Sequence, residues 1–593
     1  MKKLRPLLPY LRPRVPRMAV GLVFVLLANL VGMAVPRIVK GGIDALERHA
    51  AAERLPNAVA VLERAALLVV GAYLLRGTFQ FLMRQTMIGL ARDVEYELRR
   101  DLFGHILSLP PAWFDKNKTG DVVSRATNDV EAVRMLCGFS IAGLANAFFA
   151  LTFAIIGMSL ISVRMTLIAL VPLLALAVLV KQTGARMHDL SKRVQEQLSR
   201  ISARAQEAFA GVRVVKAFAR EAREVEGFDV LSREYADRTM QLVRTQAFTW
   251  SAMAMVAEVG VTVTLLVCGR GIIAGEFTKG DFIAFSAYQF MLLWPMTSLG
   301  WILNMVQRGA ASMGRVSEIL SVPGEPATAG TGRRLEGRLE FRSLTFAYGD
   351  PARPALRDVS FTVPAGATVA IVGRTASGKS TLVSLVPRLY APPRGTVFVD
   401  DMDVLDLPAA ELRAHVGMVP QDSFLFSDTV SGNIAFGRPG ASEEEVRGAA
   451  RRARVEGDIL GFTDGYLQRV GERGITVSGG QKQRLAIARA LLVDPRVLIL
   501  DDALSSVDAE TEEAILTELR EVFRGRTVLL VSHRVSTVRL ADRIVVLDEG
   551  RVVEEGTHAE LIARGGLYTA MAERQAIEGE LLGMGNSHSA ITQ

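Results

Sequence analysis

The chain contains 593 residues with a formal net charge of +7, and half of its residues are hydrophobic while 22% are charged. At about 100–200 residues per domain, this length predicts more than one domain. The composition excludes a disordered chain, because the apolar content is high and the charge is ordinary. It also excludes a disulfide scaffold, because Cys137 and Cys268 are the only cysteines and both lie beside apolar runs. The mean hydropathy of +0.26 indicates one apolar and one water-soluble half, and the basic balance leaves nucleic acid or a membrane open as partners.

The first half of the sequence contains apolar segments long enough to cross a membrane. Met18–Pro36 holds 19 residues without a charge, enough to span a hydrocarbon core of about 30 Å. This run is too long for a signal-peptide core and lacks a small-residue cleavage site, so we expect a retained first span. Residues 135–180 carry a single charge, Arg164, and are too long for one crossing, so we expect two spans with a turn near Ser162–Arg164. Six spans are predicted in all, and the other three cover residues 65–90, 247–268 and 282–306.

Lys and Arg residues in the connecting segments predict the orientation of these spans. They gather between the second and third spans and between the fourth and fifth spans, and cytoplasmic loops carry such an excess. We therefore expect a multi-pass protein of the cell inner (cytoplasmic) membrane, with both termini and two long charged excursions in the cytoplasm. Much of the net positive charge then reflects the orientation of the spans in the membrane, and this argues against nucleic acid as a partner.

The character of the sequence changes at a Pro- and Gly-containing linker, Ser321–Arg334. After it, strand-like and helix-like segments alternate, as is typical of a soluble α/β domain. We expect a membrane domain over residues 1–320, a linker over 321–336, an α/β domain over 337–575 and a loosely held tail over 576–593.

A phosphate-binding motif lies near the start of the α/β domain. The segment from Gly373 to Ser380 fits G-x-x-x-x-G-K-[ST], with an apolar strand before it and a helical run after it. Glycines let the backbone wrap a phosphate chain, exposed N–H groups favour anions, and Lys379 reaches the β- and γ-phosphates. Ser380 would offer its hydroxyl to Mg²⁺. The predicted nucleotide-binding residues are Gly373, Arg374, Thr375, Ala376, Ser377, Gly378, Lys379, Ser380 and Thr381.

Two further apolar strands end in groups that suit phosphate chemistry. The run 496–500 is followed by Asp501 and Asp502, and a carboxylate at such a strand end is the usual Mg²⁺-side partner of a phosphate loop. The alternative is an aspartate that caps a turn. The run 526–531 is followed by Ser532 and His533, and His533 could orient the γ-phosphate or the attacking water, or be an ordinary strand-end histidine.

A third feature completes the pattern, because the segment 477–481 reads VSGGQ before a helical run. Alone it is a weak signal, an N-cap and an anion nest. With the other motifs, the chain resembles an ABC exporter half-transporter, with one transmembrane domain fused to one ATPase domain. VSGGQ matches the family signature LSGGQ with Val for Leu, and the implied ATP contacts are Ser478, Gly479, Gly480 and Gln481. The resemblance implies a multi-domain fold, a six-helix all-α transmembrane domain followed by an α/β P-loop nucleotide-binding domain, with ATP and Mg²⁺ as cofactors.

The resemblance also assigns roles to single residues. Tyr348 stands where the family stacks an aromatic ring on adenine, and Gln421 matches the Q-loop glutamine. Asp508 belongs to a D-loop-like segment, and His533 stands at the H-switch. The implied metal ligands are Ser380, Gln421 and Asp501, and the implied catalytic residues are Asp502, His533 and Gln421.

Three segments resemble parts of the family that connect ATPase and membrane domains. Residues 114–129 are similar to the first coupling region, and residues 207–221 to the stretch around the second. Residues 470–474 resemble a loop that touches the cytoplasmic helices in exporters. The resemblance implies that the cytoplasmic excursions carry ATPase motion to the spans.

One residue departs from the family pattern. The residue after the Walker B aspartate is usually a glutamate that serves as general base, and here it is Asp502. Aspartate retracts the carboxylate by about 1.5 Å, one carbon–carbon bond, and a 1 Å misplacement can cost about 10²-fold in rate. The site should bind ATP and hydrolyse it slowly, unless backbone adjustment lets Asp502 serve. An intact signature beside a poor Walker B resembles the degenerate-site subunit of a heterodimer, so we expect a heterodimer with a second half-transporter rather than a homodimer.

The predicted spans contain one acidic residue near the middle of the fifth span, Glu258. A lone charge at the bilayer centre costs roughly 2.5–3.5 kcal/mol on insertion scales, so it should face a cavity or a partner. Glu258 could attract a cationic or amphipathic substrate, form a structural pair with a residue such as Arg76, or lie at cytoplasmic depth.

The expected activity is ATP-coupled export of amphipathic drugs or lipids by alternating access, the work of a translocase. The alternatives are a lipid flippase and a nucleotide-gated regulatory subunit with little hydrolysis of its own. The expected partners are the second half-transporter, membrane lipid and a hydrophobic or amphipathic small molecule, with no nucleic acid.

Overall fold

The computed structural model describes residues 2–51, 55–325, 332–471, 477–505 and 509–577. The chain divides into two compact units. One consists of Met1–Leu107 and Gly120–Val322, and the other of Ser108–Thr119 and Pro323–Gln593. The segment Ser108–Thr119, which the sequence places within the membrane half, thus belongs structurally to the second unit.

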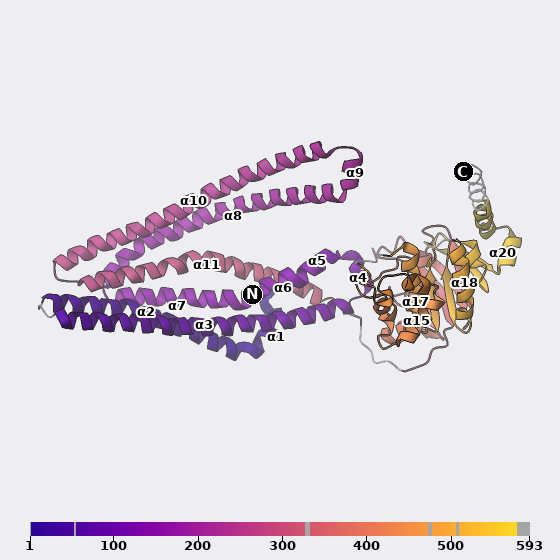
Figure 1. Ribbon diagram of the computed structural model, residues 1–593, viewed down its shortest axis with the longest axis horizontal. Coiled ribbons are helices and arrows are strands. Elements are labelled where there is room, and N and C mark those ends of the chain that lie inside the picture. Colours follow the sequence, from indigo (N-terminus) through magenta and orange to yellow (C-terminus); the bar gives the residue numbers. More distant parts are fainter. Residues whose placement is uncertain (1, 52–54, 326–331, 472–476, 506–508, 578–593) are drawn as a thin grey trace. The chain divides into compact units, whose positions relative to one another are not determined.

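Long helices dominate the first unit, after a few short N-terminal turns (Figure 1). The described elements are η1 (Lys2–Leu7), α1 (Leu8–Leu11), η2 (Arg12–Arg14), α2 (Val15–Ala51), α3 (Leu55–Ser108), α5 (Thr119–Ser124), η3 (Arg125–Asp129), α6 (Val130–Met135), η4 (Leu136–Ser140), α7 (Ile141–Ser159), α8 (Val163–Ala210), α9 (Val212–Ala217), α10 (Glu221–Ile273) and α11 (Lys279–Leu320). The segments η3 and η4 are short π-helical turns inside one continuous helical stretch.

Several of these helices are suited to a membrane. In the described part of the chain, four helical stretches are long and apolar enough to cross one, namely Leu4–Arg48, Thr119–Ser159, Glu221–Ile273 and Lys279–Leu320. Val163–Pro172 is a shorter apolar helix. The turn predicted near Ser162–Arg164 lies between the end of α7 at Ser159 and the start of α8 at Val163. Ser162 caps α8, because its side chain accepts a hydrogen bond from the backbone of Met165.

A buried cluster around Tyr288 holds the helices of the first unit together. Tyr288 of α11 is fully buried, and its hydroxyl donates to the backbone oxygen of Met33 in α2 at 2.6 Å. Gly157 of α7 gives the ring its space, because a Cβ at this position would lie 2.6 Å from the Tyr288 ring. Cys268 and Phe285 complete the contact from α10 and α11. A single large side chain thus packs against several of the predicted spans.

The second unit is an α/β domain that contains two sheets. Its described elements are α4 (Pro111–Lys116), β1 (Leu339–Phe346), β2 (Leu356–Val363), β3 (Thr368–Gly373), α12 (Lys379–Leu385), β4 (Val397–Val399), β5 (Met402–Asp403), α13 (Ala409–His415), β6 (Val416–Val419), α14 (Val430–Ile434), η5 (Ala435–Gly437), α15 (Glu443–Arg452), α16 (Glu456–Leu460), η6 (Gly465–Leu467), α17 (Gly479–Leu492), β7 (Val497–Asp501), α18 (Ala509–Phe523), β8 (Thr527–Val531), α19 (Val535–Val538), β9 (Arg543–Asp548), β10 (Arg551–Gly556) and α20 (His558–Arg564). The smaller sheet has the order β2-β1-β4-β5, and the larger has the order β10-β9-β3-β8-β7-β6.

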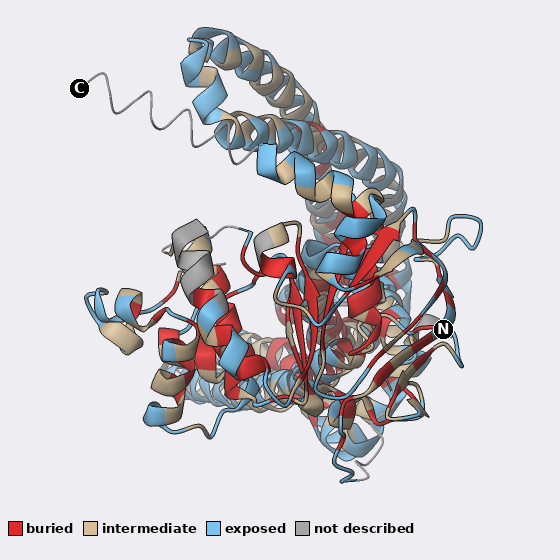
Figure 2. Ribbon diagram, turned by 90° about the vertical axis from the view of Figure 1, so that its right-hand side faces the viewer, coloured by how far each residue is buried: buried red, intermediate tan, exposed pale blue. Residues whose placement is uncertain are grey.

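The larger sheet explains why the motifs meet. Its strands β9, β3, β8, β7 and β6 run parallel, and every residue of β3, β7 and β8 is buried (Figure 2). Parallel strands covered on both faces read as continuous apolar runs, which is the pattern seen in the sequence. Ligands bind at the carboxyl ends of such strands, and the segments 373–380, 501–502 and 532–533 lie at the ends of β3, β7 and β8.

Candidate functional site

The phosphate-binding motif forms the loop between β3 and α12. Gly378 adopts φ +100°, and a Cβ at this position would lie 2.8 Å from the backbone oxygen of Ala355. Gly373 ends β3 at φ +153°, where a Cβ would lie 2.0 Å from the oxygen of Leu547. Both positions therefore require glycine for conformational and steric reasons. The loop delivers its backbone to the amino end of α12, where the N–H groups and the dipole favour an anion.

Lys379, the first residue of α12, is buried beneath this loop. Its ammonium group donates to the backbone oxygens of Gly373 at 2.9 Å and Arg374 at 2.7 Å. Burial lowers the pKa of Lys379, while the nearby charges of Asp502 and Asp501 act in the opposite direction. The cation is thus held at the base of the loop, where a phosphate group would be bound.

Asp501 ends β7 and lies against the same loop. The hydroxyl of Ser380 donates to Asp501 Oδ1 at 3.0 Å. Burial raises the pKa of Asp501, the Ser380 bond lowers it, and the charge of Asp502 raises it further.

This pair of oxygen donors fits Mg²⁺, which prefers hard ligands and retains several waters and substrate phosphates. Among the described residues no group of three or more His, Cys, Asp or Glu could hold a metal ion. A protein contribution of a hydroxyl, a carboxylate and an amide suits an ion that is bound chiefly through the nucleotide.

A cavity of about 330 Å³ brings most of the predicted residues together. Its lining consists of Ala355, Thr375, Ala376, Ser377, Gly378, Lys379, Ser380, Thr381, Gln421, Asp501, Asp502, Val531 and His533. Gly373 and Arg374 do not line it, and they contribute the carbonyls that bind Lys379. Gln421 reaches the cavity because it follows β6, the strand beside β7.

Two lining residues were missed by the sequence analysis, Ala355 and Val531. Val531 is the last residue of β8, and a strand end beside a phosphate loop could have suggested it. Ala355 comes from the loop between β1 and β2, in the other sheet, and nothing in its local sequence indicates a role.

Asp502 and His533 follow two neighbouring strands of the larger sheet, β7 and β8. The backbone N–H of Asp502 donates to the oxygen of Val531 at 2.9 Å. Asp502 adopts φ +49°, a left-handed conformation that aspartate tolerates better than most residues. Burial lowers the pKa of His533, the charge of Lys379 lowers it further, and Asp502 raises it. His533 is therefore neutral at pH 7, so its imidazole can accept as well as donate a hydrogen bond.

Tyr348 lies next to the loop with half of its surface exposed. Its hydroxyl donates to Thr381 Oγ1 at 3.0 Å. Its ring meets those of Phe346 and Tyr390 edge to face, with centroids 5.2 Å and 4.9 Å away. The ring is thus held by two aromatic neighbours and the hydroxyl bond, while half of the residue's surface stays exposed.

The signature-like residues form the amino end of α17 and do not line the cavity. Ser478 caps the helix and forms a capping box with Gln481. The side-chain amide of Gln481 also donates to Asp458 Oδ1 of α16 at 2.9 Å. Gly479 and Gly480 form the first turn, and the backbone N–H groups of Ser478 and Gln481 are used within the capping box. Asp508 and residues 472–474 of the exporter-like loop 470–474 lie outside the described residues.

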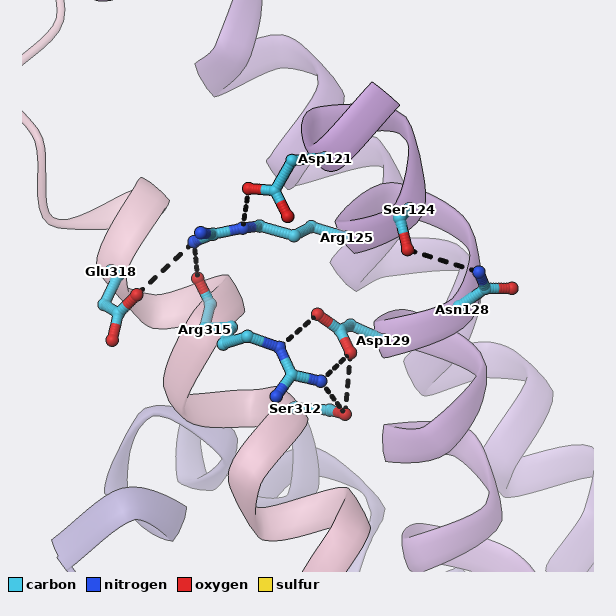
Figure 3. Close-up of polar contacts among 8 residues, drawn as sticks. All are labelled: Asp121, Ser124, Arg125, Asn128, Asp129, Ser312, Arg315 and Glu318. Carbon is cyan, nitrogen blue, oxygen red and sulfur yellow. Dashed lines mark hydrogen bonds and ion pairs between the residues drawn. The ribbon is translucent and has the colours of Figure 1, made fainter. Parts of the chain in front are cut away.

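A polar cluster joins the start of the third long helical segment to the end of α11 (Figure 3). Arg125 donates to Asp121 at 2.9 Å and to the backbone oxygen of Arg315 at 3.2 Å. Asp129, on the next turn, accepts hydrogen bonds from Arg315 and Ser312. The residues that resemble the first coupling region thus bind the helix that leads to the linker.

Glu258 lies on α10 with its side chain exposed. In the part of the chain that the structure describes, no ion pair joins it to Arg76, which belongs to α3. Its backbone oxygen accepts the hydroxyl of Thr262 at 2.9 Å.

Comparisons with known proteins agree with this arrangement. The family described as "ABC transporter transmembrane region" matches residues 18–296, and the family described as "ABC transporter" matches residues 356–505. The multidrug resistance-like ATP-binding protein MdlA of Escherichia coli is 35% identical over 570 residues, 94% of each chain. An ATP-dependent lipid A-core flippase of Chromohalobacter salexigens is 34% identical over 579 residues, 97% of this chain and 98% of the relative. The solved structure of a bacterial Atm1-family ABC exporter with ATP bound superimposes with a TM-score of 0.78 at 30% identity, covering 95% of this chain and 98% of that one.

A helical membrane unit followed by an α/β unit with a phosphate loop defines an ATP-driven membrane transporter. The chain belongs to the ABC transporter family, and it is an ABC exporter that carries its transmembrane and ATP-binding domains in one polypeptide.

Proposed function

We propose that this exporter moves amphipathic molecules, drugs or lipids, out of the cytoplasmic leaflet by ATP-coupled alternating access. The nucleotide would lie in the cavity lined by Lys379, Ser380 and Asp501, with its base against Tyr348. The observation that carries the proposal is the convergence of Lys379, Ser380 and Asp501 with Gln421 and His533 on one cavity of about 330 Å³. Tyr348 lies outside its lining and is hydrogen-bonded to Thr381, which lines it. Mg²⁺, held through Ser380, Gln421 and Asp501, would neutralise the phosphate oxygens.

We further propose six membrane crossings, one for each long helical segment, with both termini and the ATP-binding domain in the cytoplasm. The four stretches suited to a membrane support this. The remaining segments are α3, whose apolar part is interrupted by Arg76 and Arg84, and α8, which begins with the apolar helix Val163–Pro172. The distribution of Lys and Arg supports the orientation.

The signature at the start of α17 supports a dimer, because none of its residues lines the cavity beside the chain's own phosphate loop. In a head-to-tail pair, each ATP would be held between one Walker loop and the partner's Ser478–Gln481 counterpart. With Asp502 in place of glutamate, this chain would supply the signature for a hydrolysing site on a second half-transporter. A heterodimer accounts for this combination better than a homodimer does.

The substrate would be amphipathic, with Glu258 as a candidate anchor for a cationic group. Its exposed side chain argues against an internal pair. A separate cavity of about 310 Å³ between α2, α3 and α11 combines apolar residues such as Phe290 and Met291 with Tyr73 and Arg76. A lining with an apolar body and a few polar groups suits ligands that have both characters.

Reconstitution into vesicles tests the proposal. ATP and Mg²⁺ should drive a fluorescent amphipathic dye or a labelled phospholipid across the membrane, and Lys379→Ala should abolish both ATP binding and transport. Movement of the phospholipid alone would favour the flippase. ATP binding without movement of either probe would favour a nucleotide-gated subunit. Asp502, in place of the usual glutamate, supports this alternative.

A further inference from the structure

Helix α4 (Pro111–Lys116) is part of the ATP-binding unit, although its sequence lies between two of the long membrane helices. Within the unit, a hydrogen bond fixes its carboxyl end. The hydroxyl of Tyr390 donates to Asp115 Oδ2 at 2.8 Å, across 275 positions of the sequence. Tyr390 follows α12, the helix that begins at the phosphate loop.

The protonation state of Tyr390 fixes the direction of this bond, although the bond is exposed. Burial raises the pKa of Tyr390 to about 12, and the hydrogen bond and charge of Asp115 contribute. The phenol is therefore a hydrogen-bond donor throughout the physiological pH range. A bond to a carboxylate is stronger than one between neutral groups.

The other side of Tyr390 contacts the predicted base-binding residue. The rings of Tyr390 and Tyr348 meet edge to face, with centroids 4.9 Å apart and planes at 89°. Tyr348 is fixed further by its bond to Thr381 at 3.0 Å and by Phe346. Edge-to-face aromatic contacts contribute about 0.5–1.5 kcal/mol beyond area burial and depend on ring orientation. A base that stacks on the open face of Tyr348 would therefore restrain the ring that Tyr390 contacts.

We propose that Tyr390 is a positioning residue that links the base site at Tyr348 to helix α4, so that a bound purine base, rather than the phosphates alone, orders this helix. This inference rests on the proposed ATP site. It assigns a distinct role to the base, because the phosphate groups would contact the loop and Lys379, which line the cavity, whereas Tyr348 does not line it. Tyr390 does not line the nucleotide cavity, so it acts through Tyr348.

A second route from α4 to the domain runs through the linker. The backbone N–H of Glu325 donates to the oxygen of Ser108 at 2.7 Å, and Arg413 binds the Glu325 carboxylate at 2.8 and 2.9 Å. This route does not involve the base site. Removal of the Tyr390 hydroxyl therefore breaks the route through Tyr348 and leaves the route through the linker intact.

Hydrogen exchange of the full-length chain in lipid nanodiscs tests the link, with saturating Mg-ATP or Mg-tripolyphosphate as the probe. Tripolyphosphate has the phosphates of ATP and no base. In the wild type, both ligands should protect residues 373–381, and ATP alone should protect residues 108–119. Tyr390→Phe keeps the ring and removes the donor, so the protection of 373–381 by ATP should remain and that of 108–119 should be lost. Asp115→Ala should give the same result from the other partner.

Tyr10→Phe is the matched control, because Tyr10 donates to Asp101 at 3.1 Å in the other unit, and it should respond as the wild type. Protection of 108–119 by tripolyphosphate, or its persistence in Tyr390→Phe, would overturn the link and favour the linker route. Failure of ATP to protect 373–381 in the wild type would overturn the proposed nucleotide site, and this inference with it. Retained protection at 373–381 in each variant shows that the domain is folded.

Discussion

Asp129 and Arg315 form a paired contact between the third long helical segment and α11. Arg315 Nε donates to Asp129 Oδ2 at 2.8 Å, a second guanidinium nitrogen binds the other carboxylate oxygen, and Ser312 donates to that oxygen at 2.8 Å (Figure 3). Asp129 is buried while the Arg315 side chain is about half exposed. The carboxylate stands on a π-helical turn, Arg125–Asp129, a feature that recurs at functional sites. The pair therefore fixes where α11 meets the segment similar to a coupling region.

We expect Asp129→Ala to destabilise the first unit by about 1–3 kcal/mol, the range for hydrogen bonds to a charged group. The value should stay below that of a fully buried pair, because solvent can reach Arg315 when its partner is removed. The thermal midpoint of the purified protein measures the loss. Asp229→Ala is the control, since the Asp229–Arg233 pair on α10 is exposed and should contribute little. Equal effects of the two substitutions would contradict a structural role for Asp129.

The pKa shift of His533 leads to a pH dependence of ATP binding. Burial and Lys379 hold its pKa below the ordinary value of about 6.5, so the free site keeps the imidazole neutral. Phosphates favour the imidazolium, so ATP binding should take up a proton, and the affinity should rise as pH falls below about 6.5. Binding of a fluorescent ATP analogue to wild type and His533→Ala measures this. The nucleotide titrates in the same way in both experiments, so the comparison cancels its contribution. An identical dependence of ATP affinity on pH in the two proteins would contradict the assignment of His533 to the site.

The exposed carboxylate of Glu258 predicts a charge-selective effect on transport. Glu258→Gln should reduce export of a cationic amphipathic dye and leave a neutral dye of similar size unchanged. Transport assays in vesicles measure the ratio of the export rates of the cationic and the neutral dye. Glu276→Gln is the matched control, because this residue is exposed just beyond the end of α10. A loss that is equal for both dyes would indicate a structural role instead.

The convergence of the candidate site residues on one cavity was predictable from sequence, because the segments that form it are local and lie at the ends of buried strands. Gly373–Ser380, Asp501 and His533 therefore meet at one end of the larger sheet, as parallel strands require. The contacts that connect elements were not predictable. Tyr390 and Asp115 are 275 positions apart, and Asp129 and Arg315 are 186 apart. Such pairs depend on tertiary packing, which leaves no periodic signal in the chain.

Helix lengths show a similar limit. The apolar pattern of the second predicted span covers residues 65–90, whereas α3 runs from Leu55 to Ser108. The hydropathy pattern records only the apolar part of the helix, and the helix continues where its residues favour that conformation. The charged part of α3 is of this kind, since Arg92, Glu95 and Arg99 form ion pairs at helical spacing.

The central claim is that this exporter chain binds ATP at a weakly hydrolysing site and depends on a second half-transporter for turnover. The most direct test is the steady-state ATPase rate of the chain purified alone in lipid nanodiscs, for the wild type and Asp502→Glu, with Asp502→Asn as the inactive control. We expect binding of ATP by all three proteins and a rate about 10²-fold higher in Asp502→Glu than in the wild type, because the longer side chain restores the reach of the general base. A wild-type rate equal to that of Asp502→Glu and well above that of Asp502→Asn would contradict the account.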